Sequence, residues 1–151
     1  MNDFKIERAT TDDISELYSL QLIAFESEAE MIGSRQVPAL QESAEENRND
    51  FPNWQTLKII NGEGEIIAAL RYKHIDGIVE VGRVMTHPEY RLKGLAVKLL
   101  EEVDKIFSQK TKELYTCTKS WTNIRLYEKV GYKADREVTE DNGLSFVYMR
   151  K

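Results

Sequence analysis

The sequence predicts a mixed α/β (α+β) domain, in which one six- to seven-stranded twisted sheet carries about four helices on its faces. Three observations lead to this prediction. Apolar residues alternate with period two in some segments, recur at helical spacing in others, and turn-forming residues separate the segments. The length of 151 residues is typical of one domain, and no linker, repeat or biased segment divides it. We therefore expect a single domain over residues 1–151.

The first third of the chain is predicted to contain one strand and two helices. Thr11 is a suitable helix N-cap, because two aspartates follow it and favour the first helical turn. The stretch after Phe25 is acidic and includes Gly33, which favours a loop or a broken helix. The expected elements are a strand at 4–9, a helix from Thr11 to about Phe25, a loop or broken helix over 26–37 and a helix over 38–47.

The rest of the chain is predicted to alternate between strands and helices. The stretches 61–64 and 76–77 are typical of tight turns between antiparallel strands, and Gly82 indicates a bulge. An apolar stripe at helical spacing over 95–107 predicts a long amphipathic helix. The expected strands are 54–60, 65–74, 78–86, 114–118, 132–138 and 144–149, and a shorter helix is expected over 123–130.

Charge and cysteine content argue against several classes of function. The formal net charge is -5, whereas nucleic-acid-binding domains are usually basic. Residues 1–50 hold 12 acidic and 4 basic side chains, whereas residues 51–151 hold 14 acidic and 17 basic ones. The first part could therefore attract a cation and the second an anion. The alternative is that the charged residues only form ordinary solvated surfaces. One cysteine, Cys117, and two histidines argue against disulfides and a zinc site. With no apolar run long enough to span a bilayer and no secretory-signal pattern, we expect a cytoplasmic protein without a metal, nucleic-acid or membrane partner.

The stretch with the most specific chemistry runs from the end of a predicted strand to the start of the long helix. Arg91 and Lys93 precede Gly94, and Gly94 opens that helix. Unpaired N–H groups at a helix N-terminus attract anions, and a glycine lets a phosphate approach the backbone closely. The turn therefore predicts a site for a pyrophosphate, although an ordinary strand-to-helix turn can show the same spacing.

Two motifs in this order resemble the GCN5-related N-acetyltransferase (GNAT) superfamily. Arg91, Gly94 and Ala96 occupy the defined positions of its acyl-CoA motif, Gln/Arg-x-x-Gly-x-Gly/Ala. The segment 126–132, Leu-Tyr-Glu-Lys-Val-Gly-Tyr, is similar to the later Leu-Tyr-Glu-Lys-Leu-Gly-Phe segment of the family. The resemblance covers residues 55–133 best. Within the family, the chain is similar to small bacterial members whose substrates are unassigned. It implies the GNAT fold, in which two central parallel strands splay apart.

The resemblance implies that acetyl-CoA is the acyl donor. In the family, the strand before the turn pairs with the pantetheine arm, and the turn and helix start hold the pyrophosphate. The residues at these positions are Val84, Met85, Thr86, Arg91, Leu92, Lys93, Gly94, Leu95, Ala96 and Val97. A further cofactor-binding Asn of the family is replaced by Ser120, and Asn123 is the expected substitute. Leu92 stands where a glycine is usual, which is tolerated if the position needs no positive φ.

Two residues are candidates for acid–base catalysis. An amine must lose a proton to attack a thioester, and the departing thiolate must gain one. Tyr127 matches the tyrosine general acid of the family, although it could also be an aromatic packing residue. Glu80, eleven residues before Arg91, has the spacing of the catalytic glutamate in the histone acetyltransferase branch. It is either a base, acting directly or through water, or an exposed carboxylate paired with Arg71 or Arg83.

The acceptor is expected to be a primary amine. In the family the segment after the first strand usually forms one wall of the acceptor site, and here it is acidic, which favours a cationic small molecule or a protein or peptide amine. Phe25, Glu26 and Glu28 are the candidate acceptor contacts. Two functions remain open: an N-acetyltransferase, or a non-catalytic acyl-CoA sensor of the same fold. The resemblance also implies a homodimer as a further option.

Overall fold

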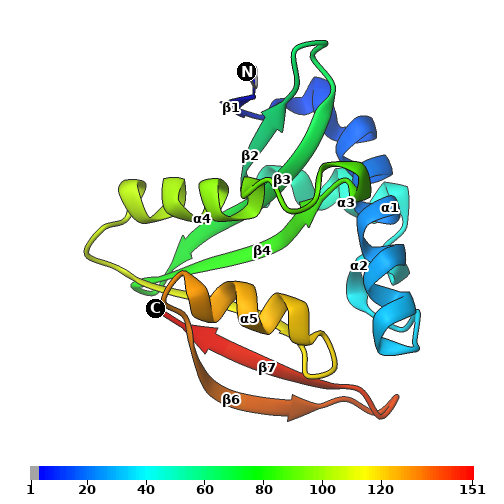
Figure 1. Cartoon of the computed structure of the whole chain (residues 1–151), viewed down its shortest axis with the longest axis vertical. Coiled ribbons are helices and arrows are strands. Elements are labelled where there is room, and N and C mark those ends of the chain that lie inside the picture. The colour runs from blue at the N-terminus through cyan, green and yellow to red at the C-terminus, as the bar shows by residue number, and fades with distance from the viewer. Residues whose placement is uncertain (1–3) are drawn as a thin grey trace.

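The computed structural model describes residues 4–151 and contains one mixed sheet with helices on both faces (Figure 1). Within these residues the strand order is β1-β2-β3-β4-β5-β7-β6. The strands are β1 (Lys5–Arg8), β2 (Gln55–Ile60), β3 (Ile66–Ile75), β4 (Ile78–Thr86), β5 (Thr111–Cys117), β6 (Lys133–Thr139) and β7 (Ser145–Arg150). The α-helices are α1 (Ile14–Ile32), α2 (Pro38–Gln41), α3 (Ala44–Asp50), α4 (Leu95–Ile106) and α5 (Trp121–Lys129). The predicted fold class is confirmed.

The sheet divides into two parts at its one parallel junction. Strands β4 and β5 pair only where residues 78–80 face residues 111–113, and they diverge beyond that point (Figure 1). Strand β4 also contains the expected bulge, because two of its residues, Arg83 and Val84, lie opposite the single Leu70 of β3. Arg83 adopts a φ of 46° there. The splayed strands leave an opening in the middle of the sheet.

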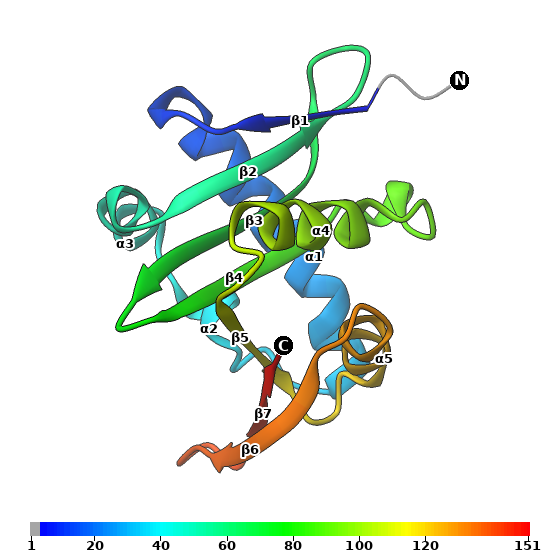
Figure 2. The same cartoon turned by 90° about the vertical axis from the view of Figure 1, so that its left-hand side faces the viewer.

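Helices α4 and α1 cover opposite faces of β2–β4 (Figure 2). The predicted apolar stripe of α4 is confirmed for Leu95, Leu99, Leu100 and Val103, which are buried in the main core, whereas Ile106 at the end of the helix is exposed. Burying a Leu or Val side chain contributes about 1.5–3 kcal/mol, so this stripe is enough to fix the helix on the sheet. The position of the helix start, next to the opening between the strands, follows from this packing.

Helix α1 differs from its expected extent. It continues past Phe25 to Ile32, and Gly33 ends it with a φ of 75°. The acidic residues of this stretch do not break the helix, since Ala29 and Ile32 continue its buried stripe. The expected loop or broken helix over 26–37 is therefore wrong for its first half.

Two further boundaries are corrected. Thr10 rather than Thr11 begins the first turn, and its N–H donates to the Asp13 carboxylate at 2.9 Å. The expected single helix over 38–47 is two helices, α2 and α3. The chain is extended at Glu42, and a capping box between Ser43 and Glu46 starts the second helix.

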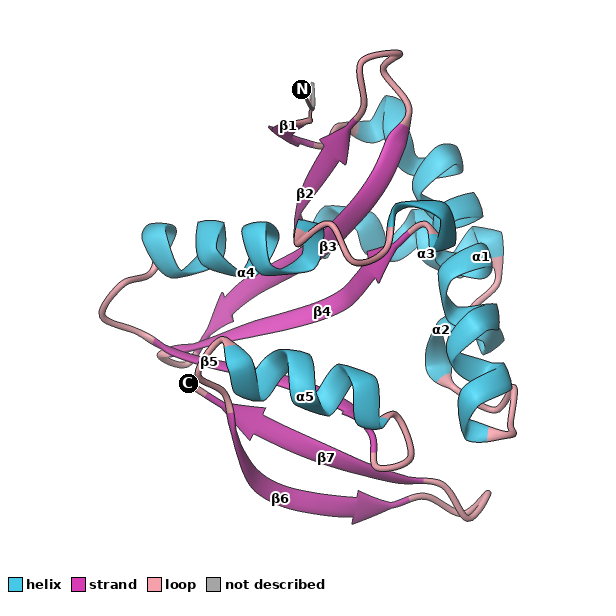
Figure 3. Ribbon diagram, in the orientation of Figure 1, coloured by secondary structure: helices cyan, strands magenta, loops and turns pink. Residues whose placement is uncertain are grey.

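Helices α2 and α3 pack beside α1 (Figure 3). The buried Gln21 of α1 donates to the carbonyl oxygen of Ala39 and to the Glu42 carboxylate, both at 2.9 Å. These bonds join α1 to α2 and to the residue that follows it. None of the helices in residues 4–151 combines the length and apolar character needed to cross a membrane.

Candidate active site

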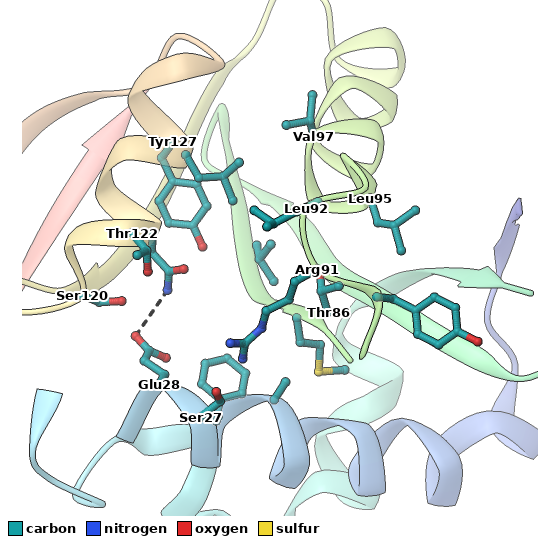
Figure 4. A pocket seen from close by; sticks show the side chains of 18 of the residues that line it. Ser27, Glu28, Thr86, Arg91, Leu92, Leu95, Val97, Ser120, Thr122 and Tyr127 are labelled. Atoms are coloured by element: carbon teal, nitrogen blue, oxygen red, sulfur yellow. Dashed lines mark hydrogen bonds between the residues drawn. The ribbon is translucent and has the colours of Figure 1, made fainter. Parts of the chain in front are cut away.

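Two pockets meet where β4 and β5 diverge. The first, here called the turn pocket, is a cavity of about 540 Å³ bounded by the end of β4, the turn before α4, α5 and α1 (Figure 4). The second, here called the strand pocket, is a cavity of about 370 Å³ lined mainly by β4 and β5. Residues common to both are Phe25, Glu28, Val84, Asn123 and Tyr127. A molecule in one pocket can therefore reach a molecule in the other past these side chains.

The turn pocket has the features of an anion site. Gly94 precedes α4 with a φ of 74°, and the first helical residues, Leu95 to Val97, line the pocket with N–H groups that have no partner within the helix. Arg91 reaches into the same pocket (Figure 4). No atom lies within 4 Å of a Cβ built on Gly94, so its backbone conformation, rather than crowding, requires glycine. The predicted anion-binding turn therefore has the local geometry that a pyrophosphate needs.

Leu92 contradicts one expectation. Its φ is 63°, in the left-handed region, and its side chain is fully exposed. The position thus does need a positive φ, and the leucine occupies it with backbone strain. Residue type alone did not reveal this.

Most of the expected cofactor-binding residues come together around this pocket. Lys93 is the exception, because it is not among the lining residues. Ser120, at the family's asparagine position, also lines the pocket and is fully buried. The expected residues that do line the pocket are Val84, Met85, Thr86, Arg91, Leu92, Gly94, Leu95, Ala96, Val97 and Asn123.

Tyr127 lies on α5 between the two pockets, and its hydroxyl points into the turn pocket (Figure 4). The residue is 4% exposed. Burial raises the pKa of the Tyr127 phenol above its ordinary value, and the charges of Glu28 and Tyr132 raise it further. The hydroxyl therefore keeps its proton at neutral pH and can donate it to a developing anion.

Glu28 projects from α1 into the junction of the pockets. Its carboxylate accepts hydrogen bonds from Asn123 Nδ2 at 3.3 Å and from Thr116 Oγ1 at 3.4 Å. The Ser120 hydroxyl faces the same carboxylate but makes no hydrogen bond of regular geometry. Burial raises the pKa of Glu28, and these neutral donors only partly oppose that effect. Asn123 is thus engaged by protein groups rather than left free.

The other carboxylates expected at the site are less central. Glu80 lines the strand pocket where β4 and β5 are still paired, and it forms an ion pair with Lys73 at 3.9 Å, not with Arg71 or Arg83. Glu26 lines neither pocket and pairs with Arg35. Of the expected acceptor contacts, the fold brings Phe25 and Glu28 to the site.

Two arginines of the strand pocket were not expected from the sequence as site residues. Arg71 donates to Asp50 at 3.2 Å and Arg83 to Glu42 at 3.4 Å. Burial, followed by the charge of Arg83, lowers the pKa of Arg71 to about 10, so the Arg71 side chain remains cationic at neutral pH. A signal was present, since Arg71 interrupts the apolar run of β3. These ion pairs also neutralise Asp50 and Glu42, two acidic residues of the segment that was expected to attract a cationic acceptor.

Comparisons with known proteins agree with the fold. A family model described as an acetyltransferase (GNAT) domain matches residues 23–151. A search of curated proteins found no match.

Several solved structures are similar to the whole chain. The PaiA N-acetyltransferase of Thermoplasma acidophilum, in complex with coenzyme A, is 20% identical with a TM-score of 0.79, covering 99% of this chain and 98% of that one. The spermidine/spermine N-acetyltransferase SpeG of Vibrio cholerae is 16% identical with a TM-score of 0.70, covering 98% and 91%. A ribosomal-protein-alanine N-acetyltransferase of Escherichia coli is 16% identical with a TM-score of 0.71, covering 97% and 92%.

Proposed function

The chain belongs to the GNAT family of acetyltransferases, which use acetyl-CoA, and from this premise we propose that it transfers the acetyl group to a primary amine. The observation that carries the proposal is the meeting of two pockets between splayed strands, with Tyr127 at the junction. The turn pocket would hold the donor, with its pyrophosphate at the start of α4 and its pantetheine arm along residues 84–86. The strand pocket would hold the amine.

In the proposed reaction, the neutral amine attacks the thioester carbonyl directly. Tyr127 supplies a proton to the sulfur as the C–S bond breaks, since a phenol buried beside a carboxylate keeps its proton at neutral pH. Glu80 is the base that the resemblance suggests. It is half-exposed and paired with Lys73, which favours action through a water molecule over direct contact.

We propose a cationic small molecule or a protein or peptide amine as the acceptor. Two structural neighbours give an example of each class: one is an N-acetyltransferase of spermidine or spermine, and the other of a ribosomal-protein alanine. Within this chain, the support is the carboxylate of Glu28 at the inner end of the strand pocket. The fold alone does not determine the acceptor.

The first experiment is calorimetric titration with acetyl-CoA, followed by a thiol-release screen over polyamines, aminoglycosides, amino acids and peptides in the same buffer. Binding together with thiol release supports the proposal. Binding without release on any amine favours the second candidate, a non-catalytic acyl-CoA sensor, for which the turn pocket alone would suffice. No binding contradicts the assignment of the turn pocket.

Two further proposals come from the sequence. Cytoplasmic residence is supported by a lone buried thiol, Cys117. Homodimer formation through β6 is supported by the exposure of that edge strand along its whole length. Light scattering of the purified protein measures the mass, and a single-chain mass would contradict the dimer.

A further inference from the structure

We propose that Glu28 binds the ammonium group of the acceptor and takes its proton, so that the first proton acceptor of the reaction lies on α1 rather than on β4. This inference rests on the proposed acetyl transfer. Its starting point is position: Glu28 is the one carboxylate in the described residues that lines both pockets. Its carboxylate therefore lies at the junction where an amine in the strand pocket would meet a thioester in the turn pocket.

The second step of the argument is charge pairing. Three carboxylates line the strand pocket, and two of them already have cationic partners. Glu80 pairs with Lys73, and Glu113 pairs with Arg136 and Arg150. Among the described residues Glu28 has no cationic partner: it accepts hydrogen bonds from the neutral groups Thr116 and Asn123, and the neutral Ser120 hydroxyl faces it. A partly buried carboxylate without a cationic partner is a site for an incoming cation.

The groups around Glu28 leave this role open. The charged or titratable side chains that line the pockets from the neighbouring elements are Tyr127 and Lys129 on α5, Tyr90 and Arg91 before α4, Glu80 and Arg83 on β4, and Glu113, Tyr115 and Cys117 on β5. Within residues 4–151 none of them forms a hydrogen bond or an ion pair with Glu28. Burial raises its pKa, which brings the carboxylate closer to the pH range in which a base must accept a proton.

The proposed step balances as follows. The ammonium R–NH3⁺ gives one proton to the Glu28 carboxylate and becomes R–NH2. The nitrogen lone pair forms the C–N bond at the thioester carbonyl, and collapse of the tetrahedral intermediate breaks the C–S bond. Tyr127 protonates the thiolate and regains a proton from the acetylated nitrogen. Glu28 releases the first proton to solvent after the products leave, so one proton is released in each turnover.

The test compares Glu28→Gln with wild type over a wide pH range, using the amine identified by the thiol-release screen. We expect kcat/KM to fall by roughly 10²–10⁴-fold at neutral pH. Most of the loss should be recovered at a pH above the pKa of the free amine, because the acceptor is already deprotonated there and needs no base. The affinity for acetyl-CoA should stay within twofold of wild type.

Glu30→Gln is the matched control, because it removes an exposed carboxylate from the same helix two residues away. It should retain wild-type kinetics. A loss in Glu28→Gln that is the same at every pH would falsify proton transfer, and so would a wild-type pH profile. A profile altered by Glu80→Gln but not by Glu28→Gln would place the base on β4.

Binding and folding measurements separate this inference from the proposed function. Each amine of the screen is titrated into wild type and into Glu28→Gln in the presence of CoA, which has no acetyl group to transfer. If wild type binds the amine without turnover and Glu28→Gln does not bind it, acetyl transfer and the proton step are overturned but the ammonium site is retained. If Glu28→Gln binds the amine as tightly as wild type, the ammonium site is overturned.

Thermal unfolding checks that the variant is folded. Because burial raises the folded-state pKa of Glu28, the ionised carboxylate destabilises the fold once the pH exceeds its ordinary value of 4.5. Glu28→Gln should therefore be at least as stable as wild type at neutral pH. A strongly destabilised variant would assign the carboxylate a structural role instead.

Discussion

At the residue scale, the chemistry depends on a few side chains whose surroundings the sequence could not describe. Tyr127 was predicted from a motif, but its burial in the main core and its proximity to Glu28 come from the tertiary fold. Glu28 was one of many acids in its segment. Only the fold separates it from Glu26, which lies on the same helix and pairs outside the pockets.

Tyr127→Phe tests the general acid directly. Removing the hydroxyl leaves the ring in place, so the affinity for acetyl-CoA should be unchanged while kcat falls by roughly 10²–10⁴-fold. Steady-state kinetics and calorimetry on the same preparation measure both quantities. Unchanged turnover would return Tyr127 to the packing role that the sequence left open.

Leu92→Gly should stabilise the protein by about 0.5–1 kcal/mol, because it relieves the strain of a left-handed leucine at a small cost in chain entropy. No burial is lost, since this side chain is fully exposed. Urea denaturation measures the difference. Lys93→Gly is the control: its φ is not positive, so it should gain no stability, and equal effects in both variants would contradict the explanation.

At the element scale, the order of strands and helices was predictable because alternation and helical spacing are local properties of the sequence. Strand β4 was predicted with its observed bounds, and the α4 stripe was correct except at Ile106, which is exposed. Errors arose where tertiary contacts decide the outcome. The last turns of α1 are acidic and look like a loop in isolation, but Ala29 and Ile32 bury against other elements.

Gly94→Ala tests the turn that starts α4. An alanine at a φ of 74° is strained, and its methyl group would stand where a phosphate approaches the helix N-terminus. We expect the dissociation constant for acetyl-CoA to rise at least tenfold, as measured by calorimetry. Gly143→Ala controls for strain alone, because Gly143 also has a positive φ and open space around it but lines neither pocket. Equal losses of affinity in the two variants would contradict phosphate binding at this turn.

At the scale of the whole molecule, the sequence predicts the fold class better than the site. The two motifs indicated where the donor would bind, since a turn and a helix start are continuous in sequence. The strand pocket combines residues from β3, β4, β5, β6, β7 and three helical segments, and no local pattern relates them. The ion pairs of Arg71 with Asp50 and of Arg83 with Glu42 could therefore not be foreseen, nor could their effect on the charge of the pocket.

The short contact between β4 and β5 has a consequence for hydrogen exchange. Beyond residues 78–80 and 111–113, the facing edges of the two strands lack each other as backbone partners. An elongated ligand lying along residues 84–86 would serve in place of a missing strand and join the two halves of the sheet. Amide exchange over 81–86 should then slow markedly when acetyl-CoA is added, as measured by mass spectrometry, while exchange in β1 and β2 should change little. In that view the donor is also a structural component, and the stiffness of the enzyme would vary with the supply of its own substrate.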